Sequence, residues 1–319
     1  MVRISTEEVK HFAEAYVDKI NVSDVDRQLD NLLNIVANSS PHVNYVKKLK
    51  ALNKRELITA VPSKFEALIK EFNKLGTDVA AKFGTKATPF HKLISDALGY
   101  DKARSIYRSY VSKMGIRTCM YCNAQYAITF EIYNGKEYAQ FEIDHWKSKS
   151  LYPFLAISFY NFVPSCSCCN KHKGNNDLKY SMYSEKPRSQ AGDEYDPFVF
   201  VITDESLAKY LNGFNTEKIQ LEFISRSNNT AEEQDYARFA IKEMYNLFNE
   251  EAALVIKRYL FYSHSYQEQM KQNYSSLFGD HETFDEFVFG VPLSRNKVPN
   301  RPLAKLTQDI RKQLGQLLY

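Results

Sequence analysis

The first third of the chain shows the apolar spacing of amphipathic helices. Within residues 1–117, the clearest stripe places apolar side chains at i, i+4, i+7, i+8 and i+11, positions that share one face of an α-helix. Its members are Val25, Leu29, Leu32, Leu33 and Val36. Two further helical patterns end at Gly76 and Gly115, as is common at helix C-termini. We predict a helical N-terminal domain.

The period of the pattern changes after residue 117. Two β-rich runs, Tyr126–Tyr133 and Glu137–Trp146, are joined by Asn134-Gly135. This dipeptide favours the positive φ angles of a tight hairpin turn. A third apolar run and a helix complete the window, at Phe159–Val163 and from about Cys166–Cys169. The order strand, strand, strand, helix is therefore predicted here.

The rest of the chain is predicted to be mostly helical, with a short β element. Strands are expected at Phe198–Ile202 and Lys218–Ile224, and a long helix or helix pair over Ala231–Phe278. A final helix would carry Leu303, Leu306, Ile310 and Leu314 on its apolar face. The predicted fold class is thus α+β, mostly helical around a central β-containing module. The predicted domains are 1–117, 118–185 and 186–319.

Composition and charge narrow the picture. Of 319 residues, 44% are hydrophobic and 25% are charged, which is typical of a globular protein. The start of the chain lacks the apolar core of a signal peptide, and no stretch reaches the roughly 18–20 apolar residues of a membrane span. We therefore expect a cytoplasmic protein with no membrane partner. Residues 291–319 carry six basic side chains and one acidic one, and this tail is either a contact for phosphates or an acidic partner, or a solvated helix face.

All five cysteines fall in the central window. Cys119 and Cys122 form one Cys-x-x-Cys pair, and Cys166 and Cys169 form a second. In the cytosol such pairs favour metal over disulfides, and four thiolates suit a structural zinc ion, although buried free thiols are an alternative. The 43 residues between the pairs exceed the roughly 15–20 of a zinc ribbon, so the strands would be inserted between the two halves of the site. Cys168 is expected to pack, or else to replace a neighbour as ligand.

Candidate catalytic residues lie between and beside the cysteine pairs. Asp144-His145 ends the second strand, Asn161 lies at the third, and Asn170 and Lys173 follow the second pair. This arrangement resembles the HNH endonuclease motif, a ββα-metal fold, over roughly residues 118–176. Phosphodiester hydrolysis requires an activated water and stabilisation of charge on the phosphate, and both requirements match the residue types present.

The HNH resemblance implies a role for each residue. Asp144 and Asn170 would be ligands of a catalytic ion, and their oxygen donors suit Mg²⁺ or Mn²⁺. His145 would be the general base, and Asn161 would position the loop and the base. The alternative is an Asp-His pair present by chance and an asparagine that caps a turn.

Lysines surround the motif. Lys147, Lys149 and Lys173 are candidate contacts for substrate phosphates, with solubility as the alternative reading. His172 lies two residues from Asn170, on a different helix face, and is an accessory phosphate contact at best.

The segment from Asp144 to Gly174 is also similar to the HNH subunits of Septu-type and retron-associated antiphage systems. It departs from them at Lys147-Ser148 and at Phe162. This similarity implies a DNA endonuclease in antiphage defence that works with an ATPase partner. Two other hypotheses remain open: a non-catalytic zinc-binding module that recognises nucleic acid or protein, and an RNA-directed HNH nuclease.

Overall fold

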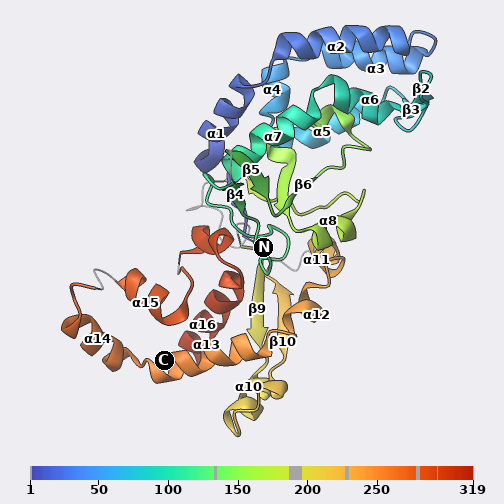
Figure 1. Ribbon diagram of the computed structural model, residues 1–319. Helices are drawn as coiled ribbons and strands as arrows, with labels where there is room; N and C mark the ends of the chain where they lie inside the picture. The colour runs from blue at the N-terminus through green and yellow to red at the C-terminus, as the bar shows by residue number, and fades with distance from the viewer. Residues whose placement is uncertain are drawn as a thin grey trace. The chain divides into compact units, whose positions relative to one another are not determined.

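The computed structural model describes residues 2–132, 135–186, 196–226, 230–277, 281–292 and 294–318, and the chain divides into two compact units (Figure 1). The N-terminal unit comprises Arg3–Ile116 and Ala127–Ala191. The C-terminal unit comprises Met1–Val2, Arg117–Tyr126 and Gly192–Tyr319. The α+β class is confirmed. The division into three domains is not tested by this packing and stays a prediction.

Helices dominate the N-terminal unit. They are α1 (Thr6–Asp18), α2 (Val22–Ile35), α3 (Ser40–Ala51), α4 (Lys54–Ile58), α5 (Pro62–Asn73), α6 (Phe90–Ala97), α7 (Tyr100–Val111) and α8 (Ser167–Lys173). The predicted stripe forms the inner face of α2, where Val25, Leu29 and Leu32 are buried. Asn21 caps this helix by accepting a hydrogen bond from the Asp24 amide at 3.1 Å.

The strands of this unit form four pairs. They are β1 (Ile4–Ser5) with β8 (Tyr183–Ser184), β2 (Lys82–Phe83) with β3 (Thr88–Pro89), β4 (Thr129–Ile132) with β5 (Lys136–Ala139), and β6 (Glu142–His145) with β7 (Phe162–Ser165). Short 3₁₀ turns, at Pro153–Leu155 and Phe159–Asn161, lie between β6 and β7.

The predicted strand Glu137–Trp146 is in fact two strands. Its first half, β5, pairs with β4, and its second half, β6, pairs with β7. The Gln140 amide still bonds the Ile128 carbonyl at 2.9 Å, so the contact with the β4 side extends to Gln140 and the pairing with β7 begins at Glu142. Tyr133, the last residue of the first predicted strand, and Asn134 of the predicted turn lie outside the described residues, and Gly135 has the expected positive φ of 71°. The predicted order of three strands and a helix is present in part, since four described strands of this window, β4 to β7, precede α8, and the HNH fold itself stays a prediction.

An aromatic core holds β7 and the segment before it. The rings of Tyr16, Tyr107 and Phe159 pack around Phe162 at the start of β7. The buried tyrosines keep their hydroxyls bonded: Tyr16 donates to the Ile157 carbonyl at 2.9 Å, and Tyr107 bonds a second tyrosine hydroxyl at 2.8 Å. Helices α1 and α7 thereby fix the segment that leads into β7.

The C-terminal unit combines one antiparallel strand pair with helices. Its strands are β9 (Phe198–Ile202) and β10 (Leu221–Ser225). Its helices are α10 (Asp204–Leu211), α11 (Thr230–Ala237), α12 (Ile241–Tyr245), α13 (Asn249–Phe261), α14 (His264–Asn273), α15 (His281–Phe289) and α16 (Ala304–Leu318), with 3₁₀ turns at Thr216–Lys218 and Arg295–Asn300.

The predictions of both strands and of the final helix are confirmed for this unit. The prediction of a long helix or helix pair is wrong. The described part of Ala231–Phe278 contains four helices, since Ala240 takes a positive φ of 48° between α11 and α12 and further breaks follow. Phe278 lies outside the described residues. In α16, Leu306, Ile310 and Leu314 are buried as expected, while Leu303 precedes the helix with a φ of 58°.

A buried asparagine ties the loop of the first cysteine pair to the end of the chain. Asn123 accepts from the Lys305 amide at 3.0 Å, and its side-chain nitrogen donates to Thr118 Oγ1 and the Val298 carbonyl, each at 3.0 Å. The residue also takes a positive φ of 54°, which asparagine tolerates better than most side chains. One side chain thus joins three segments of the C-terminal unit.

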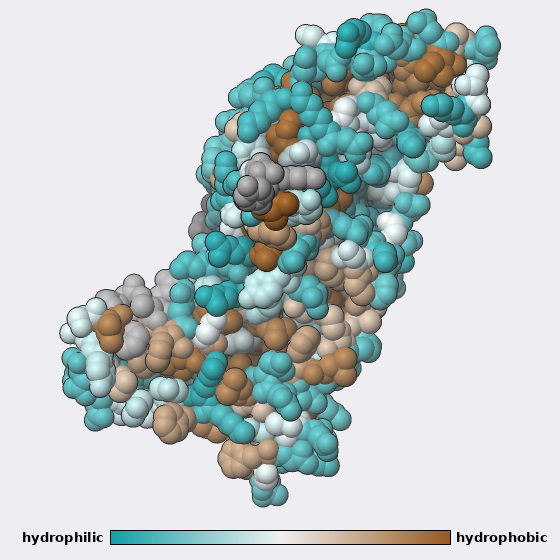
Figure 2. Space-filling view, in the orientation of Figure 1, coloured by the Kyte–Doolittle hydropathy of each residue, from teal (hydrophilic) through white to brown (hydrophobic). Residues whose placement is uncertain are grey.

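The visible surface is largely hydrophilic, with separate apolar patches (Figure 2). The most exposed large apolar side chains belong to the C-terminal unit: Leu247, Phe261, Leu277 and Phe287. In the described part of the chain, no helix combines the length and apolar character that crossing a bilayer requires.

Asn123→Ala should destabilise the C-terminal unit. The change leaves several buried groups without partners and places a less tolerant residue at a positive φ, so we expect the free energy of unfolding to fall by about 2–4 kcal/mol. Urea denaturation followed by circular dichroism measures the effect, and the fluorescence of Trp146, which lies in the N-terminal unit, shows whether that unit is affected as well. Asn34→Ala, at an exposed position of α2, is the matched control and should change stability by less than about 0.5 kcal/mol. Equal effects of the two changes would contradict the role given to Asn123.

Candidate functional site

The pairing of β6 with β7 sets the geometry of the predicted catalytic pair. Asp144 lies opposite Val163 and His145 opposite Phe162. Because successive side chains of a strand point to opposite faces, Asp144 shares its face with Glu142, while His145 is on the other face. Both members of the pair are buried, with 7% and 4% of their surfaces exposed.

His145 is held by its own backbone surroundings. Its Nε2 lies 2.9 Å from the Ala156 carbonyl, so Nε2 carries the proton and Nδ1 keeps a lone pair. Burial lowers the pKa of His145 to about 3; the bond to Ala156 opposes this, and the charges of Lys149, Lys173 and Arg104 add to it. The imidazole is therefore neutral at neutral pH, which is the state that a general base needs.

Asn161 fixes the loop that carries Ala156. Its Oδ1 accepts from the Lys147 amide at 2.8 Å, and its Nδ2 donates to the carbonyls of Lys147 and Leu155, each at 3.0 Å. The Trp146 amide also bonds the Asn161 carbonyl at 2.8 Å. The partners of Asn161 lie within two residues of His145 or Ala156 in sequence. The Asn161 side chain is fully buried and forms hydrogen bonds at both ends of the loop around His145.

The opposite face of β6 carries oxygen donors that meet helix α8. Asn170 donates through Nδ2 to Glu142 Oε2, and Lys173 Nζ lies 3.5 Å from Asp144 Oδ1. Glu142 was missed by the sequence reasoning, although its spacing of two from Asp144 on a strand was a usable signal. The two carboxylates and the amide of Asn170 are hard oxygen donors of the kind that suits Mg²⁺ or Mn²⁺.

The three predicted substrate lysines lie in different surroundings. Lys173 is fully buried beside Asp144, and Lys147 is ion-paired with Glu66 at 2.8 Å and is 4% exposed. Lys149 is half-buried, and its Nζ lies 3.8 Å from the ring centre of Tyr100. Of the three, Lys149 alone has no carboxylate within ion-pair distance in the described part of the chain. It is the lysine best placed to meet a phosphate.

Two cationic side chains, Lys149 and Arg104, lie against the ring of Tyr100 next to His145. The Tyr100 ring centre is 5.4 Å from that of His145, and the guanidinium of Arg104 lies 5.5 Å from the Tyr100 ring centre on the same helix. Arg108 is one turn further along α7, and its Nε is buried without a hydrogen-bond partner in the described structure. These residues were not predicted. Their spacing of four, from 100 to 104 to 108, places them on one helix face and was the available signal.

The four predicted zinc ligands come together. The Sγ atoms of Cys119, Cys122, Cys166 and Cys169 all lie within 4.8 Å of one another. A tetrahedral ion with bonds of about 2.3 Å would hold the sulfurs about 3.8 Å apart, so a small contraction completes the site.

Backbone hydrogen bonds prepare both pairs to act as thiolates. The Ala124 amide lies 3.4 Å from Cys122 Sγ, and the Cys169 amide lies 3.5 Å from Cys166 Sγ. Donation to sulfur favours its charged form, so the cluster fits a metal such as zinc. Cys168 and His172 are both exposed, and neither belongs to the cluster.

Comparison with protein-family models finds no match, and no solved structure matches the chain. Among curated proteins, the chain is similar to a Septu protein, PtuB, from Bacillus thuringiensis, with 31% identity over 67 residues. The match covers 21% of this chain and 23% of that protein. The similarity therefore links one segment of the chain to a Septu protein and does not extend to most of the relative's length.

The cysteine cluster should hold zinc without Cys168. We expect about one zinc ion per purified chain in the wild type and in Cys168→Ser, and loss of zinc together with a lower melting temperature in Cys169→Ser, because three thiolates bind the ion less tightly than four. Mass spectrometry of metal content and thermal melting measure both effects. Retention of zinc by Cys169→Ser with loss in Cys168→Ser would exchange the roles of the two cysteines.

Proposed function

We propose that this chain is a metal-dependent endonuclease of the HNH type, which cleaves DNA with His145 as general base. The observation that carries the proposal is the hydrogen bond from His145 Nε2 to the Ala156 carbonyl, which leaves the lone pair of Nδ1 to accept a proton. A histidine that only filled the core would not need acidic oxygen donors on the other face of its strand and a group of cations beside it.

The proposal gives each of these groups a part in the reaction. Nδ1 of His145 takes the proton of the attacking water, while Asn161 keeps the loop and the imidazole in place. Asp144 and Asn170 would hold a divalent ion, with Glu142 as a further oxygen donor. That ion would supply stabilisation of the charge on the phosphate and the leaving oxygen. The product would carry a 5′-phosphate.

Lys173 has a structural part in this proposal. Lys173 is the last residue of helix α8, and its ammonium lies against Asp144 with almost no exposure to solvent. A buried carboxylate needs such a partner. Binding of a divalent ion would reduce the negative charge that Lys173 balances. The substrate phosphates would instead meet Lys149 and Arg104, which border His145 through Tyr100.

The similarity to a Septu protein supports a role in antiphage defence, together with an ATPase partner. This part of the proposal rests on a match to 21% of the chain and on the motif residues already described. The nuclease part of the proposal is argued separately, from the contacts of His145, Asn161 and Asp144.

His145→Ala should abolish cleavage while leaving the fold and the zinc intact. We expect the rate on supercoiled plasmid with Mg²⁺ or Mn²⁺ to fall by about 10²–10⁴. His172→Ala is the matched control, since it removes an exposed histidine from α8, and its rate should stay within about twofold of the wild type. Equal cleavage by wild type and His145→Ala would refute the base. Zinc and DNA binding without cleavage of DNA or RNA by the wild type, with either ion, would favour the non-catalytic module.

Lys149→Ala should weaken binding of DNA and its dependence on salt. In a His145→Ala background, fluorescence anisotropy should show a slope of log K against log salt that is smaller by about 0.9, the value for one lost phosphate contact. Lys102→Ala is the control, because Lys102 is exposed on α7, two residues from both Tyr100 and Arg104. A slope unchanged by Lys149→Ala, or changed equally by Lys102→Ala, would remove this residue from the DNA contact.

A further inference from the structure

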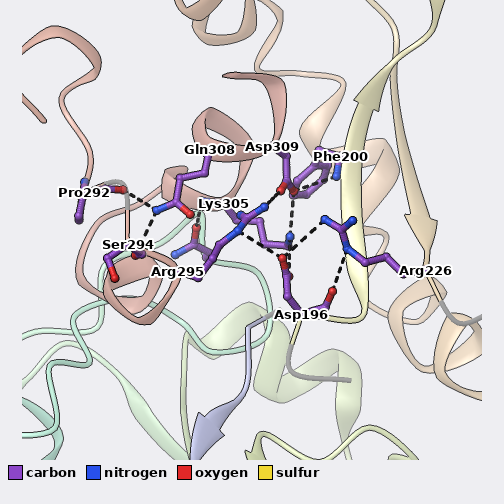
Figure 3. A network of polar contacts seen from close by, with 10 residues as sticks. Asp196, Phe200, Arg226, Pro292, Ser294, Arg295, Lys305, Gln308 and Asp309 are labelled. Atoms are coloured by element: carbon purple, nitrogen blue, oxygen red, sulfur yellow. Dashed lines mark hydrogen bonds and ion pairs between the residues drawn. The ribbon is translucent and has the colours of Figure 1, made fainter. Parts of the chain in front are cut away.

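The C-terminal unit contains a buried ion network with more positive than negative charge. Figure 3 shows Asp196 and Asp309 surrounded by Arg226, Arg295 and Lys305. Lys305 Nζ lies 2.7 Å from Asp196 and 2.9 Å from Asp309, and both Lys305 and Asp309 are shielded from solvent. Three cations therefore share two carboxylates.

Asp196 and Arg295 of this network keep their charges. Burial by itself raises the pKa of Asp196, but Lys305 and Arg295 outweigh it, and the pKa of Asp196 ends below its usual value. Burial would lower the pKa of Arg295, and Asp309 and Asp196 raise it instead. The network thus keeps an excess of one positive charge, and removing charge from water is costly unless an opposite charge is near.

A cavity opens beside the network. It has a volume of about 360 Å³ and is lined by Tyr259, Arg295, Gln308, Arg311, Lys312 and Gly315. Three of these residues are cationic, and no acidic residue lines the cavity in the described part of the chain. The volume lies at the lower end of the roughly 300–1,000 Å³ that is typical of small-molecule sites.

Polar atoms of the lining lack partners. Arg295 Nη1 and Gln308 Oε1 are buried and make no hydrogen bond in the described structure. The first is a donor with positive charge and the second is an acceptor. Lys312 is exposed and has no ion pair among the described residues. A ligand that pairs with Arg295 Nη1, Gln308 Oε1 and Lys312 must be an anion and must also offer a hydrogen-bond donor.

The absence of a side chain at position 315 contributes to the space. A Cβ added at Gly315 would lie 3.4 Å from the Tyr259 hydroxyl, so any larger side chain would project toward the tyrosine and reduce the cavity. Glycine destabilises the interior of a helix such as α16 relative to alanine. At Gly315 this destabilising residue lines the open cavity.

We propose that this cavity binds a small ligand through a phosphate group. Arginine forms paired hydrogen bonds to phosphate oxygens, and a phosphate monoester or hydrogen phosphate accepts from the cations while its own hydroxyl, or that of an attached sugar, donates to Gln308. The cavity has room for more than a bare phosphate, so a free phosphate and a mononucleotide are the two sources to be separated. The site is independent of the nuclease site, and its residues all lie in the C-terminal unit.

Calorimetric titration of the full-length, zinc-loaded chain tests the site, with inorganic phosphate, AMP and sulfate as probes. Saturable binding is expected for AMP or phosphate, and weaker binding for sulfate, which has no hydroxyl to donate. Lys312→Glu should weaken binding by about tenfold or more, since it replaces an attractive charge by a repulsive one. Arg311 is unsuitable for this test, because its guanidinium pairs with the buried Asp285 at 2.6 Å.

Lys257→Glu is the matched control and should bind as the wild type does. Lys257 is an exposed lysine of α13, two residues before Tyr259 and hence on another face of that helix. Gly315→Leu, which fills the cavity, should also block binding, and thermal melting checks that each variant is folded. Should Lys312→Glu unfold, Lys312→Ala gives the same comparison with a smaller loss.

The outcomes are distinct. Equal affinity for AMP and phosphate identifies a free-phosphate site, and preference for AMP identifies a nucleotide site. No saturable binding of either probe up to about 10 mM, which corresponds to roughly 2.7 kcal/mol, would overturn the proposal. Equal weakening by Lys312→Glu and Lys257→Glu would overturn it as well, since general electrostatics would then explain the binding.

Discussion

The hydrogen bond between His145 Nε2 and the Ala156 carbonyl is the interaction on which the candidate site depends. It selects the tautomer, it fixes the ring against β7, and it leaves Nδ1 as the only ring atom able to accept a proton. The bond forms because the loop between β6 and β7 returns to its own start. Asn161 enforces that return through hydrogen bonds to Lys147 and Leu155. A buried asparagine with satisfied bonds is rigid, and rigidity is what a positioned base requires.

Two different kinds of polar interior support the molecule. In the N-terminal unit, tyrosine hydroxyls and the amide of Asn161 satisfy backbone carbonyls through neutral hydrogen bonds, and Lys173 is buried as a cation beside Asp144. In the C-terminal unit, Asp196 and Asp309 are balanced by cations. Charged interiors cost more to build than neutral ones, and they are commonly associated with specificity or binding rather than with stability alone. The larger ion network of the C-terminal unit agrees with the anion site proposed beside it.

Local spacing explains what the sequence could predict. The Cys-x-x-Cys pairs and the Asp144-His145 strand end are each decided within a few residues, so the cysteine cluster and the end of β6 were accessible. The long helix failed because helical periodicity continues across Ala240, where the backbone turns.

Contacts between distant segments explain what the sequence could not predict. The pairing of Lys147 with Glu66 and the place of Tyr100 beside His145 depend on how α5 and α7 pack on the loop. The burial of Lys173 against Asp144 likewise follows from the packing of α8 on β6. The contacts of Lys147 and Lys173 leave no periodic pattern in the sequence, so charge alone suggested three equivalent lysines, whereas the fold places them in different surroundings.

The tautomer of His145 tests the central claim most directly. Nitrogen-15 NMR of the histidine-labelled chain, with the signal assigned by comparison with His145→Ala, separates the two neutral tautomers and the imidazolium by chemical shift. The account predicts a neutral ring at pH 7 with the proton on Nε2, because the Ala156 carbonyl accepts it. A proton on Nδ1, or an imidazolium at that pH, would contradict the account, since Nδ1 could then not receive a proton from water.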